Sequence, residues 1–286
     1  MDSQETSHGI RYRGYYINLA ESHDRDRQLR DHLLSLGLDS HYARFEAVRG
    51  VDEAASHQSP LNAGSIGCGL SHQRLLAAHR DIGTHLHILE DDAVLHPRLP
   101  ALFSQVADSL PWDLLFTDIY FSLLTPQHFQ QLNRLATRHR ANGGAALVNL
   151  RGMPFSGNTS YFVHRNSIGK VADLLGTDWI RQCKHDTFIS NLVQAGQLRA
   201  FVLMPFLSTR SSLFEDSTID SAYTSLMRAM DLQRSAFYAD ADLEKLAREA
   251  SHLGPGGPRN PLLEVYIETT RSILAHIDQG IHQKPD

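Results

Sequence analysis

Three consecutive acidic residues, Glu90, Asp91 and Asp92, follow the apolar run HLHIL at residues 85–89. A short apolar run of this kind is typical of a strand that is buried inside a sheet. In open α/β sheets, ligands bind beyond the carboxyl ends of the strands, which is where these acids would stand. The segment therefore predicts an α/β fold with an acidic site at one edge of its sheet.

Adjacent carboxylates repel one another, so the triplet needs either a counter-charge or full solvation. A hard divalent cation prefers carboxylate oxygens and leaves positions open for phosphate oxygens. The alternative is a solvated acidic turn, and these residues alone favour neither explanation. On an extended backbone, side chains two residues apart point the same way, so Glu90 and Asp92 are predicted to share one ion while Asp91 faces elsewhere.

The composition bounds the class of protein. The chain has 286 residues, of which 42% are hydrophobic and 21% are charged, as in soluble globular proteins. The net charge of −5, without a basic stripe, argues against a nucleic-acid partner. No apolar run approaches the roughly 18 residues of a membrane span, and the polar N-terminus does not resemble a secretory signal. We expect a cytoplasmic protein without a transmembrane segment.

The two cysteines, Cys68 and Cys183, lie far apart and lack the spacing of metal ligands. They are predicted to be buried free thiols in a reducing compartment. Neither an HExxH motif nor a pair of CxxC motifs occurs, so the sequence predicts no zinc site.

Hydrophobic periodicity and turn residues predict alternating strands and helices up to about residue 212. Strands are expected at residues 15–19, 42–48, 85–89, 112–117, 159–163 and 198–205. Helices are expected at 24–36, 71–81, 97–107, 167–175 and 186–195, with Ser71 as the N-cap of the second. Residues 50–63 are expected to form a loop and residues 121–158 an irregular segment. The predicted organisation is an α/β domain over residues 11–213 and a C-terminal helical extension over 214–286.

Four further segments can carry chemistry, and each also has a simpler structural explanation. The turn after Asn18 and Leu19 leads through Arg25 into a helix, an arrangement that suits phosphate but also occurs in ordinary turns. The glycine-dense residues 64–72, which include Ser71 and His72, permit either close approach of a ligand or tight packing.

Asp186, beside His185 at a predicted helix start, is either a cap or a general base. The polar residues 214–219 can cap the next helix or order over a phosphate or sugar, and the cap is favoured. After the breaker at residues 254–258, a terminal helix is expected at 261–279.

These segments, taken in order, resemble glycosyltransferase family 25, which includes bacterial lipopolysaccharide and lipooligosaccharide galactosyltransferases. The two most specific matches are IGCGLSH at residues 66–72 and LEDDAVL at residues 89–95. Supporting matches are YINL at 16–19 with Asp24 and Arg25, RFEAV at 44–48 with Gly50, residues 157–163, and Asp186. The resemblance covers roughly residues 12–210.

The resemblance implies a GT-A-type fold with a mixed, largely parallel sheet flanked by helices. It also implies transfer with inversion from a UDP-sugar, most often UDP-galactose, to a glycan or glycolipid, with Mn²⁺ or Mg²⁺ held by a DxD-like motif. The implied roles are metal binding for Asp92 and Glu90, proton removal for Asp186, and donor contacts for Asn18, Leu19, Arg25, Ser71, His72, Glu90 and Asp91. Acceptor recognition would fall within residues 121–158.

Two residues depart from the family pattern. Arg49 stands where the family often has Asp, and Glu21 stands where Arg or Lys is common. A nucleotidyltransferase and a catalytically inactive nucleotide-sugar-binding relative therefore remain as alternatives. The sequence also leaves open whether the terminal helix packs on its own chain, forms a homodimer contact or touches a membrane surface peripherally. The membrane ranks last because the helix lacks a basic face.

Overall fold

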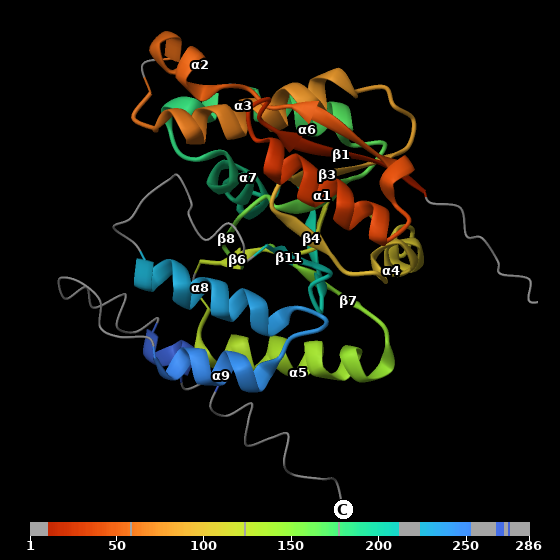
Figure 1. Cartoon of the computed structure of the whole chain (residues 1–286), viewed down its shortest axis with the longest axis vertical. Coiled ribbons are helices and arrows are strands. Elements are labelled where there is room, and N and C mark those ends of the chain that lie inside the picture. The colour runs from red at the N-terminus through yellow and green to blue at the C-terminus, as the bar shows by residue number, and fades with distance from the viewer. Residues whose placement is uncertain are drawn as a thin grey trace, which may run out of the picture.

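The computed structural model describes residues 11–57, 59–122, 124–176, 178–211, 224–252, 267–271 and 274. It is a mixed α/β structure built on a seven-stranded sheet with helices on both faces (Figure 1). The predicted α/β class is thereby confirmed. Within the described part of the chain, no helix combines the length and the apolar character needed to cross a membrane.

The order of the strands brings the predicted acidic segment to the middle of the sheet. The strands lie in the order β2 (Tyr42–Glu46), β1 (Tyr12–Asn18), β3 (His85–Glu90), β9 (Ser160–Val163), β5 (Leu114–Phe116), β10 (Ala200–Met204) and β7 (Ala146–Asn149). Strands β9 and β7 run against the other five. The ends of β1, β3, β5 and β10 and the start of β9 therefore meet at one edge. Two short ribbons lie beside the main sheet, β4 (Ala93–Leu95) with β11 (Ser208–Arg210) and β6 (Tyr120–Phe121) with β8 (Phe155–Ser156).

Two separate hydrophobic clusters cover the two faces of the sheet. Helices α1 (His23–Ser35) and α4 (Leu99–Val106) bury Leu29, Leu33 and Phe103 against one face. Helices α3 (Ala63–Ala78), α6 (Ile168–Leu175) and α7 (His185–Gln194) cover the other face. Strand β3, in the interior of the sheet, is thus buried on both sides, which explains the continuous apolar run that precedes the acids.

Helix α3 begins earlier than predicted. Asn62 caps it by accepting a hydrogen bond from Ser65 N at 2.8 Å, so Ser71 lies in mid-helix and the predicted cap at Ser71 is wrong. The glycines of this helix were expected to permit either close approach of a ligand or tight packing, and a Cβ on Gly67 would lie 2.6 Å from the carbonyl oxygen of Val48. They are required for close packing against the preceding segment. That segment is also not a loop throughout, because α2 (Gly50–His57) occupies most of it.

The predicted irregular segment at residues 121–158 is largely ordered. Its main element is α5 (Pro126–Asn142), which Thr125 caps and which ends at Gly143 in the left-handed conformation, with φ of 67°. Phe129 and Ala136 are buried in the main core. The glycine pair that suggested a turn therefore terminates a helix.

Beyond residue 223, α8 (Thr224–Phe237) contacts both α5 and α9 (Leu243–Ser251). Figure 1 shows these helices on the side of the molecule away from α2 and α3. Leu232 and Phe237 belong to the same hydrophobic cluster as the sheet. Of the predicted terminal helix, residues 267–271 are helical, and the rest lies outside the described residues except for position 274. The segments at 214–219 and 254–258 also lie outside them.

Candidate functional site

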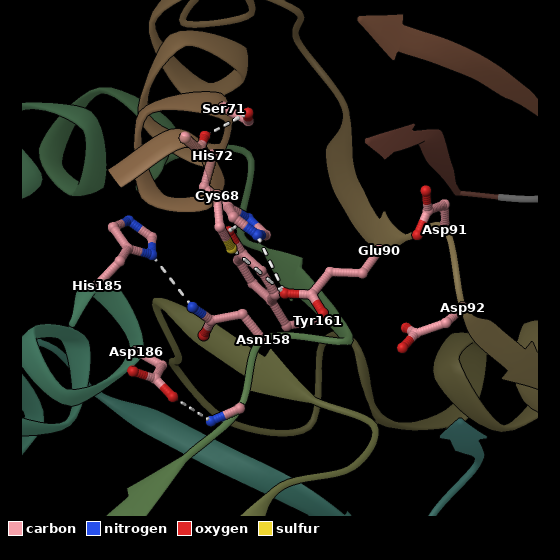
Figure 2. A network of polar contacts seen from close by, with 12 residues as sticks. Cys68, Ser71, His72, Glu90, Asp91, Asp92, Asn158, Tyr161, His185 and Asp186 are labelled. Carbon is pink, nitrogen blue, oxygen red and sulfur yellow. Dashed lines mark hydrogen bonds and ion pairs between the residues drawn. The ribbon is translucent and has the colours of Figure 1, made fainter. Parts of the chain in front are cut away.

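The acidic triplet stands where β3 ends, at the edge that the sequence predicted. Figure 2 shows that Glu90 and Asp92 extend to the same side, whereas Asp91 points towards β1. Asp91 accepts hydrogen bonds from Asn18 Nδ2 at 2.9 Å and from Arg25 Nη1 at 3.1 Å. Asp91 and Asp92 form the turn between β3 and β4, and this turn separates the functions available to the three acids.

The Asp91 side chain contacts the turn between β1 and α1. Asn18 links it to the rest of that turn by donating to the carbonyl oxygen of Ser22 and accepting from Arg44. Burial raises the pKa of Asp91, and the contacts with Asn18 and Arg25 act in the opposite direction. A surface hollow of about 510 Å³ lies over this turn and is lined by Glu21–Asp24, Arg25 and Arg27. The predicted contact residues Asn18, Leu19 and Arg25 thus lie together beside the triplet.

Glu90 turns towards α3. His72 Nε2 lies 3.6 Å and Cys68 Sγ lies 3.8 Å from Glu90 Oε1. Cys68 and His72 are four residues apart and therefore lie on the same face of the helix. Cys68 is exposed and Cys183 is only partly buried, so the prediction that both cysteines are buried is wrong.

Ser71 has a structural position. Its hydroxyl donates to the carbonyl oxygen of Gly67 at 2.6 Å and accepts from Val48 N at 2.8 Å. The side chain is fully buried, so it joins α3 to the segment after β2. Of the two donor-pocket residues predicted on this helix, only His72 reaches the acids.

Asp186 lies in the first turn of α7, as the sequence predicted. Gly157 N donates to its Oδ2 at 2.9 Å and Thr187 N donates to its Oδ1 at 2.7 Å. The neighbouring His185 is buried, and its Nδ1 lies 3.1 Å from Asn158 Nδ2 (Figure 2). The segment before β9 therefore fixes both residues at the acidic edge.

Electrostatics place three of the acids in one region. The pKa of the Cys68 thiol is raised well above its ordinary value, first by desolvation and then by the charges of Glu90, Asp186 and Asp92. These carboxylates come from a strand end, a helix start and a turn that are distant in sequence. The three carboxylates therefore lie near one thiol, and Arg210 stands beside Asp92 as a counter-charge.

Two arginines that the sequence did not single out enclose the other side of Asp92. Arg210 Nε lies 2.8 Å from Asp92 Oδ2, and Arg210 Nη1 lies 3.3 Å from the hydroxyl of Tyr120. Arg234, on α8, donates to the same hydroxyl at 2.9 Å and forms a buried ion pair with Asp118. This network joins the helical extension to the triplet, and no local pattern in the sequence predicts it.

The two departures from the family pattern contact each other. Arg49 Nε lies 3.5 Å from Glu21 Oε1, and both side chains are exposed. The two residues therefore form an exposed ion pair beside the turn that follows β1.

Comparison of the sequence with protein-family models and with curated proteins found no match.

Proposed function

We propose that the protein is a metal-dependent, inverting glycosyltransferase that moves a sugar from a UDP-sugar to a hydroxyl group of a glycan or glycolipid. The proposed donor is UDP-galactose. The observation that carries the proposal is the arrangement of Glu90, Asp92 and Asp186 around one region, at the end of β3 and the start of α7 (Figure 2). The turn that holds Asn18 and Arg25 lies beside that region.

The residues present suit a hard divalent ion. Asp92 Oδ1 is buried and lacks a hydrogen-bond partner among the described residues, so it is available as a ligand, and Glu90 offers a second carboxylate. When bound, Mn²⁺ or Mg²⁺ would neutralise the charge that develops on the departing nucleoside diphosphate. Arg210, beside Asp92, adds positive charge on the same side of the site.

Asp186 is the proposed general base. Its two backbone hydrogen bonds fix the orientation of the carboxylate. Oδ1 also accepts from the Thr187 hydroxyl, whereas Oδ2 accepts from Gly157 N and keeps a lone pair for the proton of the acceptor hydroxyl. Removal of that proton strengthens the hydroxyl as a nucleophile at the anomeric carbon, and attack from the face opposite the diphosphate inverts the configuration. Asn18, Leu19, Arg25 and Asp91 are proposed to border the uridine and ribose, and His72 to border the sugar.

Two alternative functions use the same acids. A nucleotidyltransferase would release pyrophosphate, whereas a glycosyltransferase releases the nucleoside diphosphate. A catalytically inactive relative would bind a nucleotide sugar without turning it over.

A screen of UDP- and GDP-sugars by thermal shift and by hydrolysis, with Mn²⁺ and with or without EDTA, distinguishes these functions. We expect one UDP-sugar to raise Tm only when metal is present and to release UDP slowly. Metal-dependent stabilisation without release would indicate an inactive relative, and pyrophosphate release would indicate a nucleotidyltransferase. No response to any donor would contradict the proposal.

A further inference from the structure

A second set of metal-ligand atoms lies next to the proposed donor site. Cys68, His72 and Glu90 each present one ligand atom, and the three atoms lie within 4.8 Å of one another. This set mixes a thiol, an imidazole and a carboxylate, which differs from the all-oxygen environment that Mn²⁺ or Mg²⁺ prefers.

The spacing of these atoms is close to that around a tetrahedral ion. Bonds of about 2.3 Å to sulfur and about 2.0 Å to nitrogen and oxygen place neighbouring ligand atoms roughly 3.3–3.5 Å apart at the tetrahedral angle. The distances to Glu90 Oε1 are 3.6 Å from His72 Nε2 and 3.8 Å from Cys68 Sγ. Both distances exceed the tetrahedral values by only a few tenths of an ångström, and the third pair, Cys68 Sγ and His72 Nε2, lies within 4.8 Å. The three side chains can therefore supply three of four tetrahedral positions, and water can supply the fourth.

His72 supports this geometry. Its side chain is fully buried, and its Nε2 has no hydrogen-bond partner among the described residues although it faces Glu90. Its other ring nitrogen, Nδ1, lies 3.0 Å from the hydroxyl of Tyr161. A hydrogen bond from Nδ1–H to that hydroxyl leaves the Nε2 lone pair directed at the cluster, as in most histidines that bind metals. His185 stacks on the imidazole with ring centroids 5.3 Å apart and restricts its rotation.

We propose that Cys68, His72 and Glu90 form a binding site for a thiophilic divalent cation, with Zn²⁺ as the best fit, next to the donor-metal site at Asp92, with which it shares the Glu90 carboxylate. Binding replaces the thiol proton, which passes to solvent, and involves no oxidation or reduction. The charges of Asp92 and Asp186, which disfavour a free thiolate, favour a dication at the same place. The motif search missed the site because its ligands combine an i, i+4 pair on a helix with a residue on a strand.

The binding of Co²⁺ and Zn²⁺ to the full chain tests the site directly. We expect one equivalent of Co²⁺ to give the near-ultraviolet thiolate-to-cobalt charge-transfer band and Zn²⁺ to abolish it. Titration of Zn²⁺ against a chromophoric chelator gives the affinity. Cys68→Ser should remove the band and weaken Zn²⁺ binding by at least about tenfold, whereas Cys183→Ser is the matched control and should change neither. Because Cys68 is exposed, this variant is expected to fold.

His72→Ala should also weaken Zn²⁺ binding, with circular dichroism confirming that the variant is folded. Asp92→Ala should retain Zn²⁺ binding even where it loses Mn²⁺-dependent UDP binding, so failure of the zinc site and failure of the proposed transferase function are separable. Equal Zn²⁺ affinity of Cys68→Ser and the wild type, or a Co²⁺ complex without the charge-transfer band, would overturn the proposal.

Discussion

Arg210 Nε lies 2.8 Å from Oδ2 of Asp92, while Oδ1 of the same carboxylate is buried and has no hydrogen-bond partner among the described residues. An unpaired carboxylate oxygen that is buried loses its hydration without gaining a hydrogen bond, which costs free energy. A bound ligand at Oδ1 would recover that free energy. The arginine orients the carboxylate and leaves one oxygen for the proposed metal.

The first prediction concerns this oxygen. Asp92→Asn keeps the shape of the side chain but removes its charge, so we expect Mn²⁺-dependent UDP binding to weaken at least about tenfold. Calorimetry with and without Mn²⁺ measures the effect. Asp173→Asn is the control, because Asp173 is also paired with an arginine, Arg80, but on the exposed surface. Unchanged UDP affinity of Asp92→Asn in the presence of metal would refute the assignment.

Asp186→Asn separates catalysis from binding. The amide oxygen can still accept the hydrogen bond from Gly157 N, but the side chain can no longer take a proton from the acceptor. We expect donor affinity to stay within about twofold and kcat to fall by more than about a hundredfold. Steady-state kinetics combined with donor titration measure both quantities, and a near-normal kcat would exclude Asp186 as the base.

The buried pair between Arg234 and Asp118 should stabilise the attachment of α8. Arg234→Met leaves Asp118 as an uncompensated buried charge, so we expect the free energy of unfolding to fall by about 3–5 kcal/mol. Adding Asp118→Asn to this variant should recover part of the loss. Arg228→Met on the exposed face of α8 is the matched control, with an expected change within about 0.5 kcal/mol. Urea denaturation reports all of these values.

Gly67 is predicted to be a packing requirement. In Gly67→Ala the new Cβ would lie 2.6 Å from the carbonyl oxygen of Val48 and 2.7 Å from Gly50 N, which are backbone atoms that cannot move cheaply. A loss of about 1–3 kcal/mol in stability is expected. In Gly169→Ala the nearest atom is the flexible side chain of Arg80 at 3.4 Å, so that helix should gain about 0.5–1 kcal/mol. Similar effects of the two substitutions on Tm would contradict this explanation.

Buried histidines should make the protein sensitive to mild acid. Burial lowers the pKa of His85 to about 4 and lowers those of His87 and His185 well below the usual value. Below about pH 6.5 the unfolded chain binds protons that the folded chain does not, so stability is complete above that pH and is lost as the pH falls. Each histidine contributes up to about 1.4 kcal/mol per pH unit.

The variant His85→Phe tests this dependence, because Phe retains the ring that stacks on Trp112, whose centroid lies 5.3 Å away. Unfolding free energies measured between pH 5 and 7, roughly the range in which histidine titrates, should show a shallower slope than in the wild type. The exposed His252→Gln should leave the slope unchanged. A wild-type slope in His85→Phe would contradict the assignment.

The sequence predicted every strand of the main sheet except β7, and it predicted the acidic edge, because these signals are local. An apolar run that ends in acids, and an acid at a helix start, need no information from distant residues. The start of α3 was predicted too late, because the close contacts that require its glycines are made with residues distant in the sequence. A Cβ on Gly69 would lie 2.3 Å from Trp179, a residue that the sequence gives no reason to place there. The late helix start also hid the shared face of Cys68 and His72.

The prediction of an irregular segment before β7 was wrong for a related reason. Gly143 is equally consistent with a turn and with a helix stop, and only the packing of Phe129 against the core decides between them. The arginines at positions 210 and 234 could not be predicted at all, because their partners Asp92 and Asp118 lie more than a hundred residues away. Ion pairs between residues so far apart in the sequence produce no local or periodic pattern from which they could be predicted.

The segment that follows α8 touches the strand region directly. Phe206 N donates to the carbonyl oxygen of Phe237 at 2.8 Å, and Ala239 N donates to the carbonyl oxygen of Phe206 at 2.9 Å. Arg140 of α5 holds the same turn through the carbonyl oxygen of Tyr238 at 2.8 Å. A chain cut after residue 213 would keep every carboxylate of the proposed site and still lose these backbone partners. A loss of activity after truncation at residue 213 would therefore have to be interpreted together with a measurement of whether the shortened chain still folds.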